Sequence, residues 1–482
     1  MRPRSDHTVA MNSKKLTKIV ATISDGNCSP EFLRSLHEAG MDVVRLNTAH
    51  QTPEASARVV ANVRQVSETM AILVDTKGPE VRVRGLAEPL ALRTGDAVTI
   101  PRVDEVRKGF DVSYGGFVME VPIGSRILID DGAIELAVKN AAPGMLLCEV
   151  MNDGVIRDRK SVNVPNVRLA IPALSDKDRA YLKFVADNAI DFVAHSFVRD
   201  KEDVLEVRRI LDGYGSKARI IAKIENNQGV TNLPEILDFA DGVMVARGDL
   251  GVEIPLERIP GIQKAIIAAC VKKGKPVITA TQMLHTMMEN PRPTRAEVSD
   301  VANAVFDGTD ALMLSGETAS GKYPLEAVRT MARIAIQAES QKPRATTLES
   351  EATLNQVRRY LARSAAASAL HLPVKAVIAD TETGRIARLL SSYRIHVPVY
   401  AFSPQLSTVR GLSLSYGVFS SLLPAPSSTE QLVSRSLKAL MERGQIEADD
   451  LVVVIGGAPG KSETTNFLEI NTASSCLGCD GS

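Results

Sequence analysis

Runs of apolar residues rich in valine, isoleucine and leucine recur between residues 18 and 317, and each is short enough to be one strand. Most are continuously apolar, a pattern typical of strands buried on both faces of a parallel sheet. The pattern therefore predicts eight buried strands, at residues 18–23, 42–47, 71–76, 192–197, 219–225, 242–247, 276–281 and 311–317.

Amphipathic stretches separate most of these runs. Ser175 followed by Asp178 has the spacing of a capping box, and it precedes one of the predicted helices. Eight strand–helix units of this kind predict an α/β fold with a parallel (β/α)8 TIM barrel. Its helices are expected at residues 30–40, 53–66, 176–189, 201–213, 230–239, 257–273, 296–306 and 324–338.

Residues 80–165 lie where the barrel needs only one helical connection. They contain many glycines and short alternating runs such as "VRVRGL", "DAVTIP", "RILIDDGAIELAV" and "MLLCEVM". We interpret them as a small inserted β-barrel domain. Because the insertion begins where the third strand ends, on the catalytic face of such a barrel, it could act as a lid.

The last part of the chain returns to strand–helix alternation. The stretch "QKPRATTLES" (341–350) reads as a linker, and residues 352–370 have a helical pattern. Strands are expected at 376–381, 397–402, 417–422, 450–456 and 467–471, which predicts an open α/β domain. The predicted domains are the barrel's first part (1–79), the lid (80–165), the barrel's second part (166–345) and a C-terminal effector domain (346–482).

Composition narrows the class of protein. Among 482 residues, 44% are hydrophobic, and 57 Lys and Arg balance 57 Asp and Glu. Zero formal charge argues against non-specific nucleic-acid or membrane-surface binding, and we find no apolar run of ~20 residues or secretory leader. Five cysteines suit a cytoplasmic protein. We interpret the Cys476–Cys479 CxxC as two thiols in a frayed tail.

Polar residues two apart follow six of the predicted strands and would share a face at the strand ends. In a (β/α)8 barrel such ends form the active site. One pair alone could be a solvated strand end, but six pairs together indicate a site. The pairs are Arg45 with Asn47, Asp75 with Lys77, Lys223 with Glu225, Arg247 with Asp249, Thr279 with Thr281, and Ser315 with Glu317.

The charges of these pairs suggest a metal-dependent transfer. If Glu225 and Asp249 converge to ~4 Å, they repel by roughly 4 kcal/mol at an effective dielectric constant of 20. Carboxylate oxygens without clustered Cys or His favour Mg²⁺ or Mn²⁺. Lys223 and Arg45 would add positive charge, as phosphoryl transfer or enolate stabilisation requires. Asp75 and Asn47 could hold a second cation.

Two loops of the C-terminal domain could bind phosphate. "GGAPGKS" (456–462) has only three residues between Gly456 and Gly460, so it departs from the P-loop spacing; a phosphate-binding glycine loop and an ordinary turn stay open. "TETGR" (381–385) could hold phosphate at a helix N-terminus, or be a normal strand-to-helix turn. The candidate effector residues are Thr381, Thr383, Gly384, Arg385, Gly460 and Lys461.

Long stretches carry a family resemblance: "TKIVATI", "MDVVRLN", "LVDTKGPEVR", "AKIEN", "VMVARGDLGVEIP", "TATQML" and "NPRPTRAEVSDVANAVFDGTDALMLSGETASGKYPLEAV". With them the chain resembles pyruvate kinases of the bacterial type, from about residue 16 to the C-terminus. The resemblance implies glycolytic transfer of a phosphoryl group from phosphoenolpyruvate to ADP, giving ATP and pyruvate. It also implies a homotetramer and a phosphorylated allosteric effector.

The resemblance implies a role for most of the strand-end residues. Catalysis would involve Lys223, Arg45, Thr281, Ser315 and Glu317. Lys223 would stabilise the transferring phosphoryl group and the enolate, and Ser315 and Glu317 would belong to the proton relay. Substrate binding would use Arg45, Lys223, Ala246, Arg247, Gly248, Asp249 and Thr281.

Cations and the nucleotide would occupy neighbouring positions. The resemblance implies that Glu225 and Asp249 bind Mg²⁺, with a second Mg²⁺ arriving with ADP. It assigns K⁺ to Asn47, Asp75 and Thr76, and Glu80 matches the residue associated with potassium dependence. The nucleotide side would comprise Asn47, His50, Arg82 and Lys160.

Several positions depart from the family pattern. Ala49 stands where the family has a serine in the cation site, so we expect weaker K⁺ binding. Ser161 and Asn166 replace glycines near the lid hinge. His195 replaces a commonly small residue, and we interpret it as a packed neighbour of Ser196. Ile386 replaces a Ser or Thr in the effector loop, so a sugar bisphosphate should not be assumed; AMP and a sugar monophosphate are alternatives.

Two rival functions stay open at this point. One is another Mg²⁺-dependent barrel enzyme acting on an enolpyruvate or an oxoacid, such as an aldolase or a lyase. The other is a paralogue that binds metabolites without catalysis, whose expected mark is loss of a metal carboxylate or of Lys223. Glu225, Asp249 and Lys223 are all present. We therefore favour the phosphotransferase.

Overall fold

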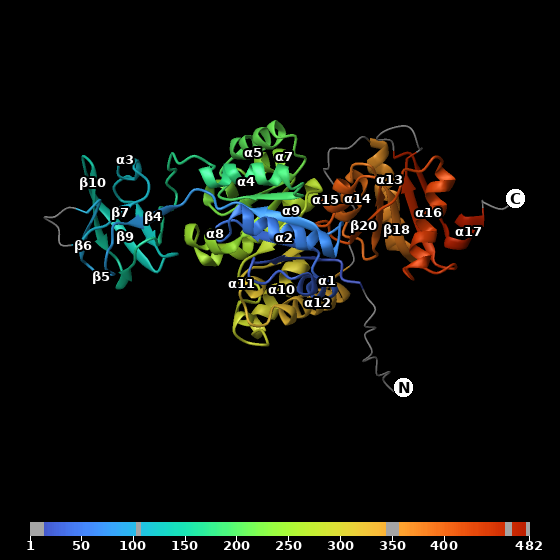
Figure 1. The fold of residues 1–482 in the computed structure, drawn as a ribbon, viewed down its shortest axis with the longest axis horizontal. Coiled ribbons are helices and arrows are strands. Elements are labelled where there is room, and N and C mark those ends of the chain that lie inside the picture. The colour runs from blue at the N-terminus through green and yellow to red at the C-terminus, as the bar shows by residue number, and fades with distance from the viewer. Residues whose placement is uncertain (1–13, 103–107, 344–355, 458–464, 479–482) are drawn as a thin grey trace. The chain divides into compact units, whose positions relative to one another are not determined.

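Eight parallel strands close into a barrel. The computed structural model describes residues 14–102, 108–343, 356–457 and 465–478. The barrel strands follow the order β1-β17-β16-β15-β14-β13-β3-β2 (Figure 1). They are β1 (Lys18–Thr22), β2 (Val43–Asn47), β3 (Ala71–Asp75), β13 (Phe192–His195), β14 (Arg219–Ile224), β15 (Gly242–Ala246), β16 (Val277–Ala280) and β17 (Ala311–Leu314).

Continuous burial explains why these strands read as uninterrupted apolar runs. Every residue of β3, β15 and β17 is buried, because the barrel interior covers one face and the helices cover the other. The eight predicted strands and the barrel are thus confirmed, with ends that differ by one to three residues.

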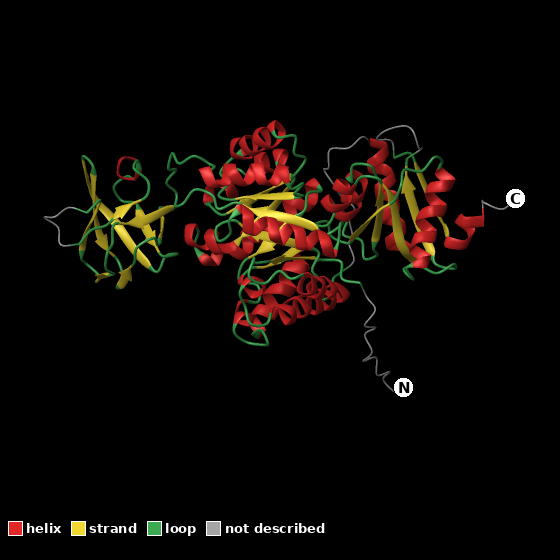
Figure 2. Cartoon of the chain, in the orientation of Figure 1, coloured by secondary structure: helices red, strands yellow, loops and turns green. Residues whose placement is uncertain are grey.

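Helices follow the barrel strands and enclose them, as the red helices around the yellow strands show (Figure 2). The predicted capping box is present: Ser175 accepts from the backbone of Asp178, and Asp178 reaches back to Ser175. The predicted helix at 230–239 is wrong at its start, because the segment forms α6 (Asn227–Thr231) and α7 (Leu233–Phe239). The other main barrel helices are α1 (Pro30–Glu38), α2 (Pro53–Val66), α4 (Asp176–Asp187), α5 (Lys201–Gly213), α9 (Ile259–Lys273), α10 (Arg295–Asp307) and α12 (Pro324–Gln341), with the short α8 (Arg247–Glu253), α11 (Gly316–Ala319), η1 (Leu256–Arg258) and η2 (His285–Met288).

Strands β4 to β12 occupy the predicted insertion between β3 and β13. They form a seven-stranded sheet of order β6-β10-β9-β8-β12-β4-β7 and a separate β11–β5 pair. A turn at Asp130–Gly132, where all three residues have positive φ, divides the run "RILIDDGAIELAV" into β8 and β9. The elements are β4 (Val81–Arg84), β5 (Leu90–Leu92), β6 (Ala97–Ile100), β7 (Asp111–Val112), α3 (Phe117–Glu120), β8 (Arg126–Ile129), β9 (Ile134–Ala142), β10 (Met145–Val150), β11 (Gly154–Ile156) and β12 (Ser161–Asn163).

The C-terminal region forms a five-stranded sheet of order β20-β19-β18-β21-β22, in which only β22 runs antiparallel. All five predicted strands are present. The predicted linker at 341–350 and the start of the 352–370 helix fall mostly outside the described residues. The elements are α13 (Gln356–His371), β18 (Val374–Asp380), α14 (Arg385–Ser392), β19 (Val399–Ser403), α15 (Leu406–Gly411), β20 (Val418–Leu422), α16 (Thr429–Glu442), β21 (Leu451–Gly456), β22 (Phe467–Thr472) and α17 (Ala473–Leu477).

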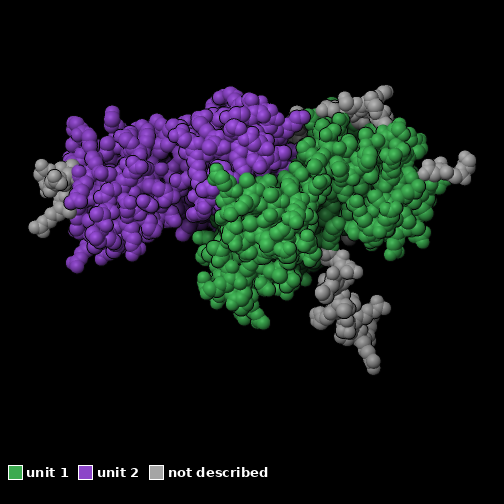
Figure 3. Space-filling view, viewed as in Figure 1, with its two compact units in different colours: residues 1–46, 54–73, 267–482 green, residues 47–53, 74–266 purple. Residues whose placement is uncertain are grey.

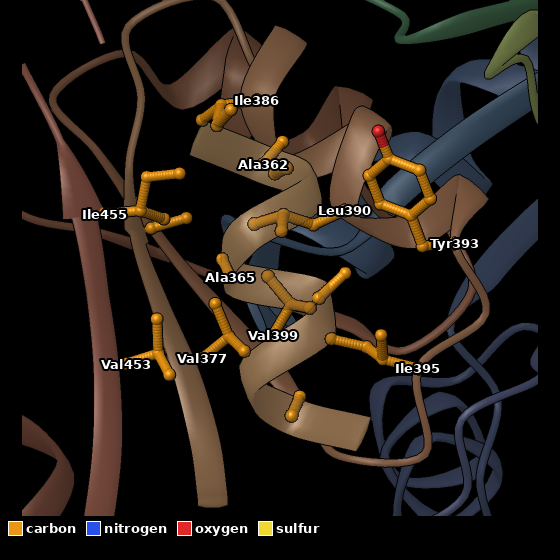
Figure 4. Close-up of a cluster of buried hydrophobic side chains, with 14 of the residues drawn as sticks. Ala362, Ala365, Val377, Ile386, Leu390, Tyr393, Ile395, Val399, Val453 and Ile455 are labelled. Atoms are coloured by element: carbon orange, nitrogen blue, oxygen red, sulfur yellow. The ribbon is translucent and has the colours of Figure 1, made fainter. Parts of the chain in front are cut away.

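One face of this sheet packs against α13 and α14. Ala362 and Ala365 of α13 and Leu390 of α14 lie against Val377 and Val453 of the sheet (Figure 4). Small alanines bring α13 close to the strands, as dense interior packing requires.

Cys476 corrects the prediction of a frayed tail. It is buried within α17 and packs in the core on the sheet's other side. Its predicted CxxC partner, Cys479, lies outside the described residues.

The chain divides into two compact units, coloured separately in Figure 3. Unit 1 comprises residues 1–46, 54–73 and 267–482, and unit 2 comprises residues 47–53 and 74–266. The domain boundaries predicted from the sequence stay a prediction. In the described part of the chain no helix is long and apolar enough to cross a membrane.

Candidate active site

Lys223 is the centre of a buried polar cluster in unit 2. It lies near the end of β14, and its Nζ is 3.0 Å from Asp75 Oδ1 and 3.0 Å from Glu225 Oε1. The same Nζ donates to Ser196 Oγ at 2.6 Å. All four residues are at most 9% exposed, so water screens their charges little. Strands β3, β13 and β14 therefore bring their polar ends together, as the pair pattern predicts.

Sequence reasoning missed Ser196 as a site residue. Its hydroxyl donates to the carbonyl oxygen of Thr76 at 2.7 Å and accepts the bond from Lys223. Ser196 therefore orients the lysine from β13's end. The available signal was its position directly after a buried strand, where the other pairs also lie.

His195 precedes Ser196 and makes no hydrogen bond to this cluster. It is fully buried, and neither ring nitrogen has a hydrogen-bonding partner among the described residues. Burial lowers its pKa to about 4, although the nearby Asp203 and Asp178 oppose the shift. A neutral imidazole at neutral pH fits the interpretation of His195 as a packed neighbour of Ser196.

Glu225 and Asp249 converge as the spacing of the pairs predicts. Burial raises the pKa of Glu225 to about 7; Lys223 opposes this shift and Asp249 adds to it. Burial also raises the pKa of Asp249, whose carboxyl group is hydrogen-bonded to Glu225. The backbone N–H of Phe197 donates to Glu225 Oε2 at 2.6 Å and fixes that carboxyl group.

The donor set of this cluster suits a hard cation. Asp75 and Glu225 pair with the Lys223 ammonium group, and Asp249 acts on Glu225 as a further negative charge, so negative charge is in excess when all three are ionised. Among the described residues no group of three or more His, Cys, Asp or Glu side chains forms a metal cage. Mg²⁺ typically takes one or two carboxylates and completes its shell with water and substrate oxygens, so two converging carboxylates fit it.

The residues predicted to bind K⁺ lie beside this cluster. Asp75 and Thr76 are buried, and the backbone N–H of Thr48 donates to the Asp75 carbonyl at 3.1 Å. The side-chain oxygen of Asn47 accepts from the backbone N–H of Ala49 at 3.1 Å. Ala49 therefore contributes a donor through its backbone and no side-chain oxygen at this position.

A cavity of about 540 Å³ within unit 2 contains the predicted nucleotide residues Arg82 and Lys160 together with Asp249. Arg82 donates to Glu80 Oε2 at 2.6 Å, and Lys160 donates to Asp130 Oδ1 at 2.8 Å. This volume is within the usual range for small-ligand sites. His50 does not line the cavity.

Arg45, Thr281, Ser315 and Glu317 lie in unit 1. Arg45 donates to Thr22 Oγ1 at 2.9 Å and is buried. Glu317 accepts from the backbone N–H groups of Ser315, at 2.8 Å, and Leu284, at 3.2 Å, so it braces the loops after β16 and β17. Thr281 has a φ of 65°, an uncommon backbone conformation that is frequent at functional sites.

Ala246, Arg247 and Gly248 start α8, the short helix that carries Asp249. Their backbone amides lie at its first turn, where helical N–H groups lack partners within the helix. Arg247 donates from its side chain to Gln263 Oε1 at 3.3 Å.

Hydrogen bonds within the effector loop hold its turn. Thr381 Oγ1 accepts from the backbone N–H of Gly384 at 2.9 Å, and the Thr383 carbonyl accepts from Arg388 at 3.0 Å. Gly384 has a φ of 78° and caps α14, which Arg385 begins. Ile386 is a core residue of the C-terminal region (Figure 4). Gly460 and Lys461 lie outside the described residues.

Comparisons with known proteins agree with this geometry. The family description "Pyruvate kinase, barrel domain" matches residues 14–328, and "Pyruvate kinase, alpha/beta domain" matches residues 359–471. A pyruvate kinase of Borreliella burgdorferi is 46% identical over 471 residues, covering 96% of this chain and 98% of that protein. One of Geobacillus stearothermophilus is 42% identical over 480 residues, covering 96% and 81%.

A solved structure of a pyruvate kinase has the same fold. The crystal structure of a pyruvate kinase from Cryptosporidium parvum matches with a TM-score of 0.87 and 35% identity, covering 95% of this chain and 96% of that one. The barrel, the site and these matches define a phosphotransferase. The chain belongs to the pyruvate kinase family.

Proposed function

We propose that this protein transfers the phosphoryl group of phosphoenolpyruvate to ADP, giving ATP and pyruvate in glycolysis. The observation that carries the proposal is the buried Lys223, held between Asp75, Glu225 and Ser196. An ammonium group fixed in a buried pocket stabilises charge that develops on a transferring phosphoryl group and needs little reorganisation to do so.

Lys223 and Arg45 would act on the phosphoryl group from two strands. Arg45 would hold the substrate phosphate, because a guanidinium group matches phosphate oxygens with paired donors. Lys223 would stabilise both the phosphoryl group in transfer and the enolate oxygen that forms when its bond to phosphorus breaks. The backbone amides at Arg247 and Gly248 would hold the substrate carboxylate.

Glu225 and Asp249 would hold Mg²⁺ or Mn²⁺. When bound, the ion would neutralise both carboxylates and polarise the oxygens of the substrate. Asn47, Asp75 and Thr76 would bind K⁺, with weaker affinity because residue 49 is an alanine. These two cation sites rest on the family and on the acid-rich pocket.

Protonation of the enolate would complete the reaction. Thr281 would lie beside the carbon that takes the proton. Ser315 and Glu317 would relay that proton through water, with Glu317 fixed by the two backbone N–H groups that it accepts. Product pyruvate then leaves.

ADP would bind between the barrel rim and the inserted strands. Arg82 and Lys160 would meet its phosphates, with Asn47 and His50 on the same side, and a second Mg²⁺ would arrive with the nucleotide. A homotetramer and a phosphorylated effector at Thr381, Thr383, Gly384, Arg385, Gly460 and Lys461 complete the proposal.

A coupled assay of pyruvate formation tests this function. We expect turnover that requires phosphoenolpyruvate, ADP and a divalent cation together, and a rate that falls when K⁺ is omitted. An aldolase or lyase would act without ADP, and a non-catalytic paralogue would show no turnover under any of these conditions.

Replacing the central lysine gives the sharpest variant test. Lys223→Met should lower kcat by at least about 10³-fold, because the transferring group loses its buried cation. The exposed Lys217, replaced by methionine in the same way, is the matched control. Near-normal turnover in Lys223→Met would refute the assignment.

A further inference from the structure

The chain leaves the inserted strands through a turn that contacts two elements of the candidate active site. After β12, residues 164–167 form a turn closed by a backbone hydrogen bond from Val167 to the Val164 carbonyl at 3.2 Å. Pro165 and Asn166 are its central residues, and Asn166 has a φ of 65°. Proline followed by a residue of positive φ is the signature of a type II turn.

The side chain of Asn166 contacts α6. Asn227 Nδ2 donates to Asn166 Oδ1 at 3.0 Å. Asn227 is the first residue of α6 and follows Glu225 by two positions. Through this bond the turn is tied to the segment that carries one of the converging carboxylates.

The backbone of the same turn contacts α8. Burial raises the pKa of the Glu253 carboxyl group, and the nearby side chain of Asn163 and backbone N–H of Asn166 oppose that shift. Glu253 is the last residue of α8, and Asp249 lies in the first turn of that helix. Asn163, Asn166, Asn227 and Glu253 all line the cavity that contains Arg82, Lys160 and Asp249.

We propose that Asn166 and Glu253 are positioning residues, which together fix the inserted strands' return segment to the α6 and α8 segments of the active site. Arg82 of β4 and Lys160 directly before β12 reach the cavity from the inserted strands, whose register depends on that return segment. Loss of the contact should therefore misplace the groups that meet ADP and leave the phosphoenolpyruvate side unchanged. The inference rests on the proposed function.

The residue types allow a variant that removes one bond at a time. Asn166→Gly keeps the positive φ at no steric cost and keeps the backbone N–H near Glu253, so it removes only the bond to Asn227. Asn227→Ala removes the same bond from the other side and leaves a good helix former at the start of α6. Glu253→Gln replaces one of two acceptor oxygens by a donor.

Steady-state kinetics of the full chain test the inference. We expect Asn166→Gly and Asn227→Ala each to raise the KM for ADP roughly three- to tenfold, the worth of one hydrogen bond, with the KM for phosphoenolpyruvate unchanged. The double variant should be no worse than either single variant, because both remove the same bond. Glu253→Gln should raise the KM for ADP further.

Ala189→Gly is the control for the added glycine, since Ala189 also has positive φ (47°) and lies in an exposed loop of the same unit. It should change neither KM. Hydrogen exchange of residues 161–171 is the second readout, and it should accelerate in Asn166→Gly and in Glu253→Gln but not in the control. A merely structural role would instead lower kcat and the melting temperature without separating the two KM values.

The outcomes separate this inference from the proposed function. Wild-type protein that does not transfer the phosphoryl group would overturn the proposed function, and hydrogen exchange would then decide the positioning role. Unchanged ADP kinetics together with unchanged exchange in Asn166→Gly would overturn the inference. Additive effects in the double variant would also overturn it.

Discussion

The strand ends around Lys223 and the loop after β18 both connect a strand to a helix. They differ in their polar groups, which are charged around Lys223 and neutral in the hydrogen bonds of the loop. Around Lys223, the buried Asp75 and Glu225 pair with one ammonium group, and Asp249 adds a further negative charge. In the loop after β18, Thr381 accepts from Gly384, and Thr408 donates to the Glu382 carbonyl at 2.7 Å. The first region needs ligands to balance its charge, whereas the second forms hydrogen bonds among its own neutral groups.

This difference separates a built site from an ordinary strand-to-helix turn. Buried charge is costly unless it is paired, so its persistence at the barrel rim indicates selection for chemistry. An effector at the C-terminal loop would have to compete with bonds that are already made. The comparison therefore supports the catalytic proposal more strongly than the effector proposal.

The largest expected effect is the acid sensitivity of the barrel region. The pKa of His195 is about 4 in the folded protein against 6.5 when unfolded, so below pH 6.5 the unfolded chain binds the extra proton. Stability should fall by on the order of 3 kcal/mol between pH 7 and pH 4 because of this residue alone. Thermal unfolding across that pH range measures it.

His195→Ala should remove this part of the pH dependence, whatever the cavity costs at neutral pH. The exposed His371, replaced in the same way, is the control. Parallel pH curves for wild type and His195→Ala would contradict the prediction.

Metal binding should depend on pH through Glu225. Because its pKa is about 7, below pH 7 a proton occupies the carboxyl group and must leave when the ion binds. Affinity for Mn²⁺, measured by paramagnetic titration, should fall roughly fivefold between pH 7 and pH 6 and change less between pH 8 and pH 7. In Glu225→Gln the binding should be weaker and this pH dependence absent. Equal affinity at pH 6 and pH 8 would count against a metal site at Glu225.

Ser196→Ala tests whether the serine orients the lysine. Lys223 would keep Asp75 and Glu225 as partners, so kcat should fall only about three- to tenfold, as expected for one hydrogen bond. Steady-state turnover measures the effect. Ser340→Ala, on an exposed helix face, is the control. A loss as large as that of Lys223→Met would mean that the serine does more than orient.

In the C-terminal sheet, an effect on stability of the opposite sign is expected. Burial and Glu382 raise the pKa of Asp380 to about 6, so the folded protein holds a proton that the unfolded chain releases. This contribution to stability is present below pH 4 and is lost as the pH rises through 6. Asp380→Asn should remove this dependence of the unfolding free energy on pH. Asp449→Asn, at an exposed position, should not. If the stability of the wild type rose between pH 4 and pH 6 while that of Asp380→Asn did not, the pKa of Asp380 would not be raised in the folded protein.

Much of the fold could be predicted because burial on both faces makes each barrel strand a continuous apolar run. The ends of the helices were harder to predict, as the break between α6 and α7 illustrates. Asn232 ends α6 and directly precedes α7, and no glycine marks the break. Cys476 was placed wrongly because its burial depends on β21 and β22, which lie elsewhere in the chain. Helical and strand periodicity carries no information about such distant packing.

Some residues of the candidate site could likewise be predicted from the sequence, and others could not. The two-residue spacing at strand ends identified Lys223, Glu225, Asp75 and Asp249, since alternate residues of a strand share a face. It could not identify Ser196, because one hydroxyl after an apolar run has the same pattern as any strand end. Nor could it predict that Asn166 and Glu253 meet, because those residues are far apart in the sequence.

The sequence by itself determined the eight-strand barrel, the inserted strands, the C-terminal sheet and the residue types that point to phosphoryl transfer. Only the tertiary structure decided which of those groups touch, how deeply they are buried and where their pKa values lie. The physical reason is that periodicity is local, whereas contact and burial arise where segments distant in sequence pack together.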